Sequence, residues 1–249
     1  MTLAADLSGR TALVTGASGA IGAHAVALFL RSSANVVATA RDPSRVKVRD
    51  DSRTLVTQLD VTDLASIDQA FEAAESRFGP VDLVLNNAGI ADGQLALQTD
   101  PARFADILAV DLTGAFAVAR AAAARMVAAK RPGSIINVAS ILGLRVAQGV
   151  AAYAAAKAGL VQLTAALGLE WARHDIRVNA IAPGYLLTDI NRSFFESEAG
   201  ARMIKRIPQR RLGELADLDG PLLLLASEAS AYMTGSVLVV DGGHVASTL

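Results

Sequence analysis

The segment Thr11-Ala-Leu-Val-Thr-Gly-Ala-Ser-Gly-Ala-Ile-Gly22 decides how the rest of the chain is interpreted. The segment opens with a short apolar run, which is typical of a buried parallel strand. The glycines come next, and an apolar helix is expected after them, to about Leu30. Glycines between a strand and a helix let the backbone approach a pyrophosphate, and the helix N-terminus offers unpaired N–H groups. The segment therefore predicts a dinucleotide-binding turn, with a purely structural tight turn as the alternative.

Strands and helices alternate along the whole chain after this segment. Further strands are expected at 35–41, 54–60, 81–86, 134–139, 175–181 and 236–241. Helices are expected up to Phe78, from Thr99 to about Lys130 with a break near Leu112-Thr-Gly114, from Tyr153 to about Arg173, and from Glu214 to about Ser227. This order predicts one α/β domain over 1–249, a doubly wound parallel Rossmann-like sheet with helices on both faces. The polar segment 185–212 is expected to form a lid over the substrate.

Composition narrows the classes of function. The chain has 249 residues, 52% of them hydrophobic and 19% charged, with a net charge of −1 and no cysteine. Thiolate catalysis and cysteine-ligated metals are excluded, and the three separated histidines (His24, His174, His244) give no reason to expect a metal. No basic surface for nucleic acid, signal peptide or uninterrupted apolar stretch of ~18 residues is apparent, so we expect a cytoplasmic protein.

Six candidate site residues share one position in the predicted strands. Ligands of open α/β sheets bind beyond the carboxyl ends of the strands. The residues expected at those ends are Gly16, Arg41, Asp60, Asn87, Ser140 and Pro183. Six polar or turn-forming positions that converge on one edge indicate a single ligand site.

Arg41 bears on the choice of dinucleotide. A dinucleotide fold that prefers NAD places an acid after its second strand, where it holds the ribose 2′-hydroxyl. Here Ala40 and Arg41 occupy that region, Asp42 lies one step further along, and Arg45 is close by. A cation at this strand end suits a 2′-phosphate, so we expect NADP(H) in preference to NAD(H), unless Arg41 is merely a solvated loop residue.

Tyr153, Lys157 and Ser140 form the candidate catalytic group. Tyr153 and Lys157 are four positions apart, which places both on one face of a helix. A nearby cation favours the phenolate form, and a hydroxyl at Ser140 can hold a carbonyl oxygen beside the phenol. The group therefore suits proton transfer to or from an oxygen that interconverts between alcohol and ketone. By itself, however, a tyrosine–lysine pair at this spacing recurs by chance.

Taken together, these segments resemble the short-chain dehydrogenase/reductase family over nearly the whole chain. The matching segments are the loop from Thr15 to Gly22, Asp60-Val61, Asn86-Asn-Ala-Gly89, Ser140, Tyr153 with Lys157, Pro183-Gly184 and Val240-Asp-Gly-Gly243. The resemblance implies that Tyr153 is the general acid or base, that Ser140 holds the substrate oxygen, and that Lys157 binds the nicotinamide ribose. It also implies cofactor contacts from Gly16, Ser18, Gly19, Ile21, Gly22, Asp60, Val61, Asn87, Ala88, Gly89, Tyr153, Lys157, Pro183, Gly184 and Thr188.

Two positions depart from the family pattern. Ala20 stands where the family usually has glycine, which should narrow the loop without abolishing binding. Asp111 begins an Asp111-Leu-Thr-Gly114 segment in which the family often has asparagine at the first position. In the family that residue serves a proton relay from the lysine, so we expect Asp111 to take part in catalysis and its charge to alter the relay.

The sequence therefore predicts an NADPH-dependent oxidoreductase that reversibly reduces a ketone to a secondary alcohol. The resemblance also allows a 3-oxoacyl thioester reductase or a sugar or sugar-acid dehydrogenase such as a gluconate 5-dehydrogenase, for which Arg145 or Arg192 could meet a carboxylate. A dinucleotide sensor without turnover is a further alternative, although Tyr153 and Lys157 weigh against it. The resemblance implies a homotetramer, or a homodimer, and the alanine-rich helix at 151–168 suits such packing.

Overall fold

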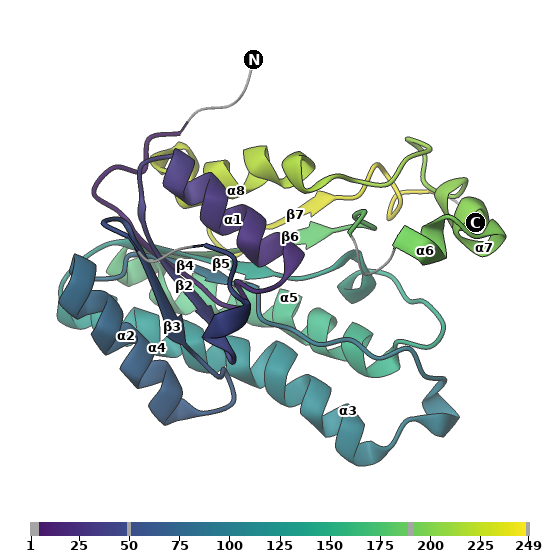
Figure 1. Ribbon diagram of the computed structural model, residues 1–249, viewed down its shortest axis with the longest axis horizontal. Coiled ribbons are helices and arrows are strands. Elements are labelled where there is room, and N and C mark those ends of the chain that lie inside the picture. The colour runs from purple at the N-terminus through teal and green to yellow at the C-terminus, as the bar shows by residue number, and fades with distance from the viewer. Residues whose placement is uncertain (1–4, 49–50, 189–191, 248–249) are drawn as a thin grey trace.

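A seven-stranded, fully parallel sheet forms the centre of the molecule (Figure 1). The computed structural model describes residues 5–48, 51–188 and 192–247. The strands are β1 (Thr11–Val14), β2 (Asn35–Ala40), β3 (Thr54–Gln58), β4 (Leu83–Asn86), β5 (Gly133–Val138), β6 (Ile176–Pro183) and β7 (Val237–Val240), in the spatial order β3-β2-β1-β4-β5-β6-β7. All residues of β1, β4 and β5 are buried, as expected when helices cover both faces of a parallel sheet. The predicted fold class is confirmed.

Helices pack on both faces of the sheet. One face carries α1 (Ala20–Arg31) and α8 (Asp219–Ala226), whose core side chains include Phe29 and Leu222. The other carries α2 (Leu64–Phe78), α4 (Ala115–Ala128) and α5 (Ala151–Trp171), whose core side chains include Phe71, Val118 and Leu167. The order of the strands reverses between β1 and β4, and at such a point open α/β sheets form the crevice in which they bind ligands.

The predicted break near Leu112-Thr-Gly114 is a wide helical turn instead. Helix α3 (Pro101–Leu108) runs into the π-helical segment η3 (Ala109–Gly114), which runs into α4 without interruption. A side chain at Gly114 would meet Val61, and one at Gly159 of α5 would meet Leu112. Close packing on both sides thus accompanies the extra residue in the turn, and π-helical turns of this kind often occur at functional sites.

Two helical stretches, 101–128 and 151–174, are long and apolar enough to cross a membrane by length and composition alone. Their core residues, such as Val118 and Met126 of α4 and Leu160 and Leu167 of α5, are buried against the sheet and its neighbours. Core helices of a globular fold have the same length and composition.

The segment expected to be a lid contains two short helices, which hydrophobic periodicity did not predict. They are α6 (Arg192–Phe195) and α7 (Glu198–Ile204), and both lie at the end of the molecule beyond β6 and β7 (Figure 1). Ser197 caps α7 by accepting a hydrogen bond from the Gly200 N–H. The helix expected at 214–227 begins as a 3₁₀ turn, η6 (Leu215–Leu218), before α8.

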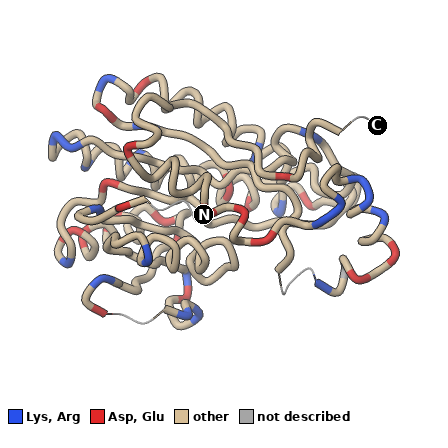
Figure 2. The backbone as a smooth tube through the Cα atoms, turned by 90° about the horizontal axis from the view of Figure 1, so that it is seen from above, with Lys and Arg blue, Asp and Glu red and all other residues tan. Residues whose placement is uncertain are grey.

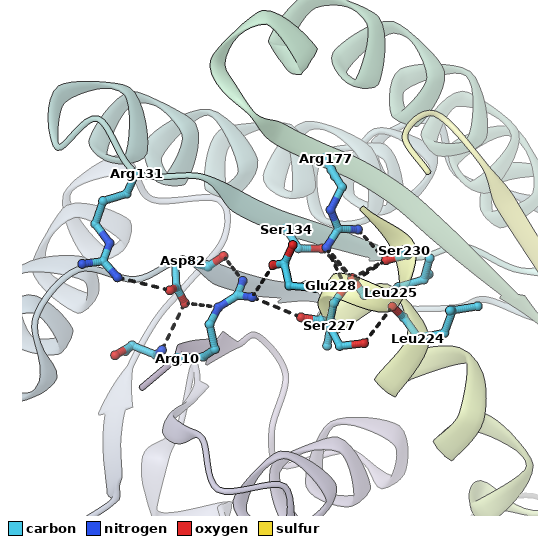
Figure 3. A network of polar contacts seen from close by, with 12 residues as sticks. Arg10, Asp82, Arg131, Ser134, Arg177, Leu224, Leu225, Ser227, Glu228 and Ser230 are labelled. Atoms are coloured by element: carbon cyan, nitrogen blue, oxygen red, sulfur yellow. Dashed lines mark hydrogen bonds and ion pairs between the residues drawn. The ribbon is translucent and has the colours of Figure 1, made fainter. Parts of the chain in front are cut away.

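The amino-terminal ends of the strands are joined by a polar network (Figure 3). Buried Asp82, just before β4, forms an ion pair with Arg10 Nε at 3.0 Å and accepts a hydrogen bond from the Thr11 N–H. Arg177 of β6 donates to Ser230 Oγ at 2.6 Å and to the carbonyl oxygens of Leu225 and Ser227. This network fastens the C-terminal end of α8 to the sheet.

Candidate active site

The glycine loop after β1 is packed too closely at Gly16 and Gly22 to accept a side chain there. Gly16 has φ +67°, and a Cβ there would lie 2.9 Å from the Ala88 Cα. A Cβ on Gly22 would lie 2.3 Å from the Gly16 carbonyl oxygen. Gly19 is the N-cap of α1 and supplies no side-chain hydrogen bond, so the first N–H groups of the helix remain available to an anion.

Thr15 and Asn87 join the ends of β1 and β4. Thr15 Oγ1 accepts hydrogen bonds from the N–H groups of Asn87 at 2.9 Å and Ala88 at 3.0 Å. In return, Asn87 Nδ2 donates to the carbonyl oxygens of Thr15 at 2.9 Å and Gly16 at 3.1 Å. These bonds fix the loop after β4 against the glycine loop, so that both line one cavity.

A cavity of about 620 Å³ lies at the carboxyl ends of β1, β2, β3 and β4. Eleven predicted cofactor residues line it: Gly16, Ser18, Gly19, Ile21, Arg41, Asp60, Val61, Asn87, Ala88, Gly89 and Thr188. The lining combines a helix N-terminus, backbone without side chains and a cation at its rim, and these are the groups that a dinucleotide requires. The residues present therefore fit a nicotinamide dinucleotide.

Several residues of the cavity were not predicted as cofactor contacts. They are Ala20, Ala40, Asp42, Arg45, Leu59, Ile90 and Val110. Most are direct sequence neighbours of predicted residues, so their nearness in the chain to those residues could have indicated them. Arg45 and Val110 are the exceptions: Arg45 lies four positions after Arg41, and Val110 lies in the π-helical turn η3, which the sequence did not indicate.

The rim of the cavity near β2 carries charges of both signs. Arg41 and Arg45 lie there with Asp42. Hydrogen bonds from the Ser44 side chain and N–H lower the pKa of the Asp42 carboxyl, so this acid is ionised at neutral pH. Asp60 likewise accepts hydrogen bonds from the Thr62 N–H and hydroxyl, which lower its pKa.

Five predicted cofactor residues do not line this cavity: Gly22, Tyr153, Lys157, Pro183 and Gly184. Gly22 lies beneath the loop against Gly16. Pro183 is the buried last residue of β6, and a side chain on Gly184 would meet Asp241 Cβ at 2.7 Å. Gly184 therefore has a packing role that needs no ligand.

Ser140 follows β5 and begins the 3₁₀ turn η4 (Ile141–Gly143). Ser140 is 8% exposed, and its Oγ accepts a hydrogen bond from the Leu142 N–H at 3.1 Å. A Cβ on Gly143 would lie 2.7 Å from the carbonyl carbon of Lys157, so η4 and α5 are in backbone contact. This contact holds the Ser140 segment against the helix that carries Tyr153 and Lys157.

Lys157 lies between Tyr153 and a buried carboxylate. Its Nζ is 5.5 Å from the centroid of the Tyr153 ring, donates to the Val138 carbonyl oxygen at 3.0 Å, and forms an ion pair with Asp111 Oδ2 at 3.2 Å. Burial raises the pKa of the Asp111 carboxyl, and the charge of Lys157 and a hydrogen bond from the Ile90 N–H oppose that increase. The predicted residues Tyr153, Lys157 and Asp111 are thus brought together.

A buried network of side-chain amides joins α5 to the sheet. Asn86 Nδ2 donates to Asn137 Oδ1 at 3.0 Å, and Asn137 Nδ2 donates to Thr164 Oγ1 at 2.9 Å. Asn86 also bonds the Ala115 carbonyl oxygen at the start of α4. This network ties β4, β5, α4 and α5 together and fixes where the helix bearing Tyr153 lies.

Arg145 has a different role from the carboxylate-binding one considered for it. Its Nη1 donates to the carbonyl oxygens of His244 at 2.7 Å and Ser247 at 3.1 Å, and so holds the C-terminal segment. The His244 ring lies 5.6 Å from that of Tyr185, which in turn lies 5.9 Å from the ring of Phe195 in α6. The segment after Ser140, the chain end and the expected lid therefore meet around Tyr185.

Comparisons with known proteins agree with this geometry. A family model described as "Enoyl-(Acyl carrier protein) reductase" matches residues 16–245. The 3-oxoacyl-[acyl-carrier-protein] reductase FabG of Escherichia coli is 35% identical over 241 residues, covering 96% of this chain and 98% of that protein. The 2-dehydro-3-deoxy-D-gluconate 5-dehydrogenase of E. coli is 33% identical over 248 residues, covering 97% of each.

A solved structure is similar over the same extent. The gluconate 5-dehydrogenase of Burkholderia cenocepacia, in complex with NADP and tartrate, superimposes with a TM-score of 0.91 at 32% identity, covering 98% of each chain. Fold, glycine loop and the full-length relatives lead to one conclusion. The chain belongs to the short-chain dehydrogenase/reductase family and is an NAD(P)-dependent oxidoreductase that acts on CH–OH and C=O groups.

Proposed function

We propose that the protein is an NADPH-dependent ketone reductase, working reversibly, with Ser140, Tyr153 and Lys157 as catalytic residues. The observation that carries the proposal is the arrangement of Tyr153 and Lys157 on one face of α5, with Nζ 5.5 Å from the ring centroid. The backbone contact between Gly143 and Lys157 keeps the Ser140 turn against the same helix. One hydroxyl, one phenol and one ammonium are thereby held at the carboxyl end of the sheet.

Each residue has a definite role in this mechanism. The Ser140 hydroxyl holds the substrate oxygen, and the Tyr153 phenol gives a proton to that oxygen as the carbonyl becomes an alcohol. Lys157 binds the nicotinamide ribose and favours the phenolate that remains. The bound dinucleotide supplies the hydride, and the protein supplies position and the proton. Gly16, Ser18, Gly19, Ile21 and Gly22 hold its pyrophosphate, and Asp60, Val61, Asn87, Ala88, Gly89, Pro183, Gly184 and Thr188 complete its contacts.

A panel of ketones assayed for NADPH oxidation tests the proposal. Tyr153→Phe should lower kcat by about 10²- to 10⁴-fold, the usual contribution of general acid catalysis, while dinucleotide affinity stays unchanged. Tyr232→Phe is the matched control, because Tyr232 is fully exposed. Dinucleotide binding without turnover of any carbonyl would favour the alternative of a sensor.

Preference for NADP(H) is part of the proposal. It is supported by Arg41 and Arg45 at the rim of the cavity, where a 2′-phosphate would meet their guanidinium groups. The NADP complex of the similar B. cenocepacia enzyme points the same way. Ionised Asp42 at the same rim opposes it, so the preference should depend on both arginines.

An anionic substrate, such as a sugar acid, is the second candidate, and the charge of the expected lid favours it. Residues 192–211 contain six Lys or Arg (Arg192, Arg202, Lys205, Arg206, Arg210, Arg211) and two Glu (Glu196, Glu198). Figure 2 shows Lys and Arg gathered at the end of the molecule that carries α6 and α7. A gluconate-type substrate in the same assay, compared with an uncharged ketone of similar size, distinguishes the two candidates.

Self-association, as a homotetramer or homodimer, is proposed through the outer faces of α4 and α5. Val127 and Leu169 are exposed there, at 41% and 82%, beside a groove that Trp171 also lines. Leu169→Glu should shift the mass measured by light scattering towards the monomer. The proposal also includes a cytoplasmic location, which fractionation of cells would check.

A further inference from the structure

Three polar groups around Tyr185 have no partner in the part of the chain that the structure describes. They are the Tyr185 hydroxyl, the Arg206 guanidinium and His244 Nδ1, and the last of these is also buried from solvent. Buried polar atoms of folded proteins nearly always have a hydrogen-bond partner, from the protein or from a bound molecule. The cluster of Tyr185, Arg206 and His244 therefore offers a ligand hydrogen bonds that the described chain does not use.

The strand order brings this cluster close to Ser140. Strand β6 lies between β5 and β7, and the last residues of β6 and β7 are paired in register. Ser140 comes two residues after β5, Tyr185 two residues after β6, and His244 four residues after β7. Neighbouring strands of a sheet lie about 4.8 Å apart. Tyr185 and His244 thus lie at the same edge of the sheet as Ser140, one and two strands away from it.

The two rings of the cluster are held in place from both sides. Arg145, in the segment after Ser140, donates from Nη1 to the His244 carbonyl oxygen at 2.7 Å. The His244 ring lies 5.6 Å from the Tyr185 ring, which packs edge-on against the buried ring of Phe195 in α6 at 5.9 Å. A site whose groups are fixed before the ligand arrives loses little conformational entropy on binding.

The charge at the cluster is positive. Burial, Arg145 and Arg206 lower the pKa of His244, so its ring is neutral at neutral pH, and Asp241 opposes that decrease. Burial raises the pKa of the Tyr185 phenol, and the charge of Arg206 opposes the increase. The Asp241 carboxylate is bonded to two backbone N–H groups, at 2.8 and 2.6 Å. Arg206 therefore acts on both rings and, within the described residues, has no carboxylate as its own partner.

We propose that Arg206, Tyr185 and His244 form a subsite that binds the carboxylate end of a hydroxy-acid substrate while the reacting carbonyl lies at Ser140. Arg206 supplies the positive charge, and the Tyr185 hydroxyl donates to a carboxylate oxygen. His244 Nδ1, which accepts or donates according to the tautomer, bonds the hydroxyl next to the carboxylate. The inference rests on the proposed function and deepens its second candidate, because it assigns recognition of the anion to three residues.

Gluconate and glucitol are the probes, because the two molecules differ only in the carboxylate at one end. Neither contains a carbonyl group that NADPH can reduce, so calorimetry on the NADPH-loaded enzyme measures binding without turnover. Gluconate should bind at least about tenfold more tightly than glucitol, the ratio that corresponds to one charged hydrogen bond. Equal affinities for the two probes would overturn the proposal.

Two variants and a matched control identify the groups that bind the anion. Arg206→Gln should weaken gluconate binding about tenfold and leave glucitol binding unchanged. Tyr185→Phe keeps the ring contacts and removes only the hydroxyl, and it should weaken gluconate binding about fivefold. Arg202→Gln removes the same charge from α7 at a position 72% exposed and paired with Glu198 at 3.6 Å, and should change gluconate affinity less than about twofold. An equal loss in Arg202→Gln and Arg206→Gln would refute the subsite and assign the effect to the total charge of the segment.

His244→Phe keeps a ring beside Tyr185 but removes both nitrogens. Because His244 is assigned to a hydroxyl, this variant should weaken gluconate and glucitol alike, about three- to tenfold. Wild-type affinity for both probes would exclude His244 from the subsite. The subsite and the proposed function fail separately: gluconate bound as expected without reduction of any ketone would sink only the function. Ketone reduction with no preference for gluconate over glucitol would sink only the subsite.

Discussion

Thr15 and Asn87 are bonded to each other in both directions: the Asn87 N–H donates to Thr15 Oγ1 at 2.9 Å, and Asn87 Nδ2 donates to the Thr15 carbonyl oxygen at 2.9 Å. The two residues directly follow the adjacent parallel strands β1 and β4. Their bonds hold the glycine loop and the loop after β4 at a fixed separation. The width of the cofactor cavity therefore depends on one buried hydroxyl.

Thr15→Val should remove these hydrogen bonds without creating a cavity, because the two side chains have nearly the same shape. The half-buried N–H groups of Asn87 and Ala88 would lose their acceptor, at a cost of up to about 1–3 kcal/mol for each group left unpaired. Urea denaturation should show the lost stability, and NADPH titration a weaker affinity. Thr57→Val on β3, at a half-buried position, is the control and should change neither the stability nor the NADPH affinity. If Thr15→Val bound NADPH as tightly as wild type, the cavity would not need this hydroxyl.

Arg41→Ala should change cofactor selectivity. A charged hydrogen bond is worth about 1.5–3 kcal/mol, so loss of a 2′-phosphate contact should raise KM for NADPH by roughly ten- to a hundredfold and leave KM for NADH nearly unchanged. Steady-state kinetics with each cofactor measures both. Arg120→Ala, at an exposed position of α4, serves as the control. An equal rise for the two cofactors would contradict the phosphate contact.

Asp82→Ala should destabilise the protein without affecting its chemistry. Removal of one partner from a buried ion pair typically costs about 3–5 kcal/mol, and Asp82 also accepts the Thr11 N–H. Thermal unfolding should show a clear loss, whereas kcat and NADPH affinity of the folded enzyme should stay at wild-type values. A variant as stable as wild type would mean that Arg10 finds another partner.

His244 should make the stability depend on pH. Burial and the neighbouring Arg145 lower its pKa below the usual 6.5, so the folded protein favours the neutral ring. A lowered histidine pKa stabilises the fold above about pH 6.5, and that stability is lost as the pH falls through the lower folded value. Wild type should therefore lose more stability than His244→Gln between pH 7 and pH 5. His174→Gln is the control, and parallel curves for wild type and His244→Gln would exclude the effect.

The sequence was most informative where local pattern alone determines structure. The strand predicted from Asn35 to Arg41 is present from Asn35 to Ala40, because residues buried on both faces of a sheet form a continuous apolar stretch of sequence. Glycines at 16 and 22 marked the turn because no other residue fits there. The tyrosine and lysine spacing also needed only helix geometry.

Features that depend on distant partners could not be predicted. Arg145 looked solvated, since its acceptors lie about a hundred positions along the chain. The turn at Ala109–Gly114 has an ordinary helical composition, and the packing of Gly114 on Val61 and of Gly159 on Leu112 is visible only in three dimensions. Helices α6 and α7 are too short for hydrophobic periodicity to reveal.

The polar network of Arg10, Asp82 and Arg177 lies at the opposite end of the sheet from Ser140 and Pro183. From Arg177 to Pro183 a strand rises roughly 20 Å, too far for side chains at the two ends to share partners. Substitutions at the two ends should therefore combine additively. Residues at the carboxyl ends of the strands can therefore be substituted to change the substrates that bind without loss of the sheet's stability. The groups that stabilise the sheet at the amino ends of the strands do not take part in substrate recognition.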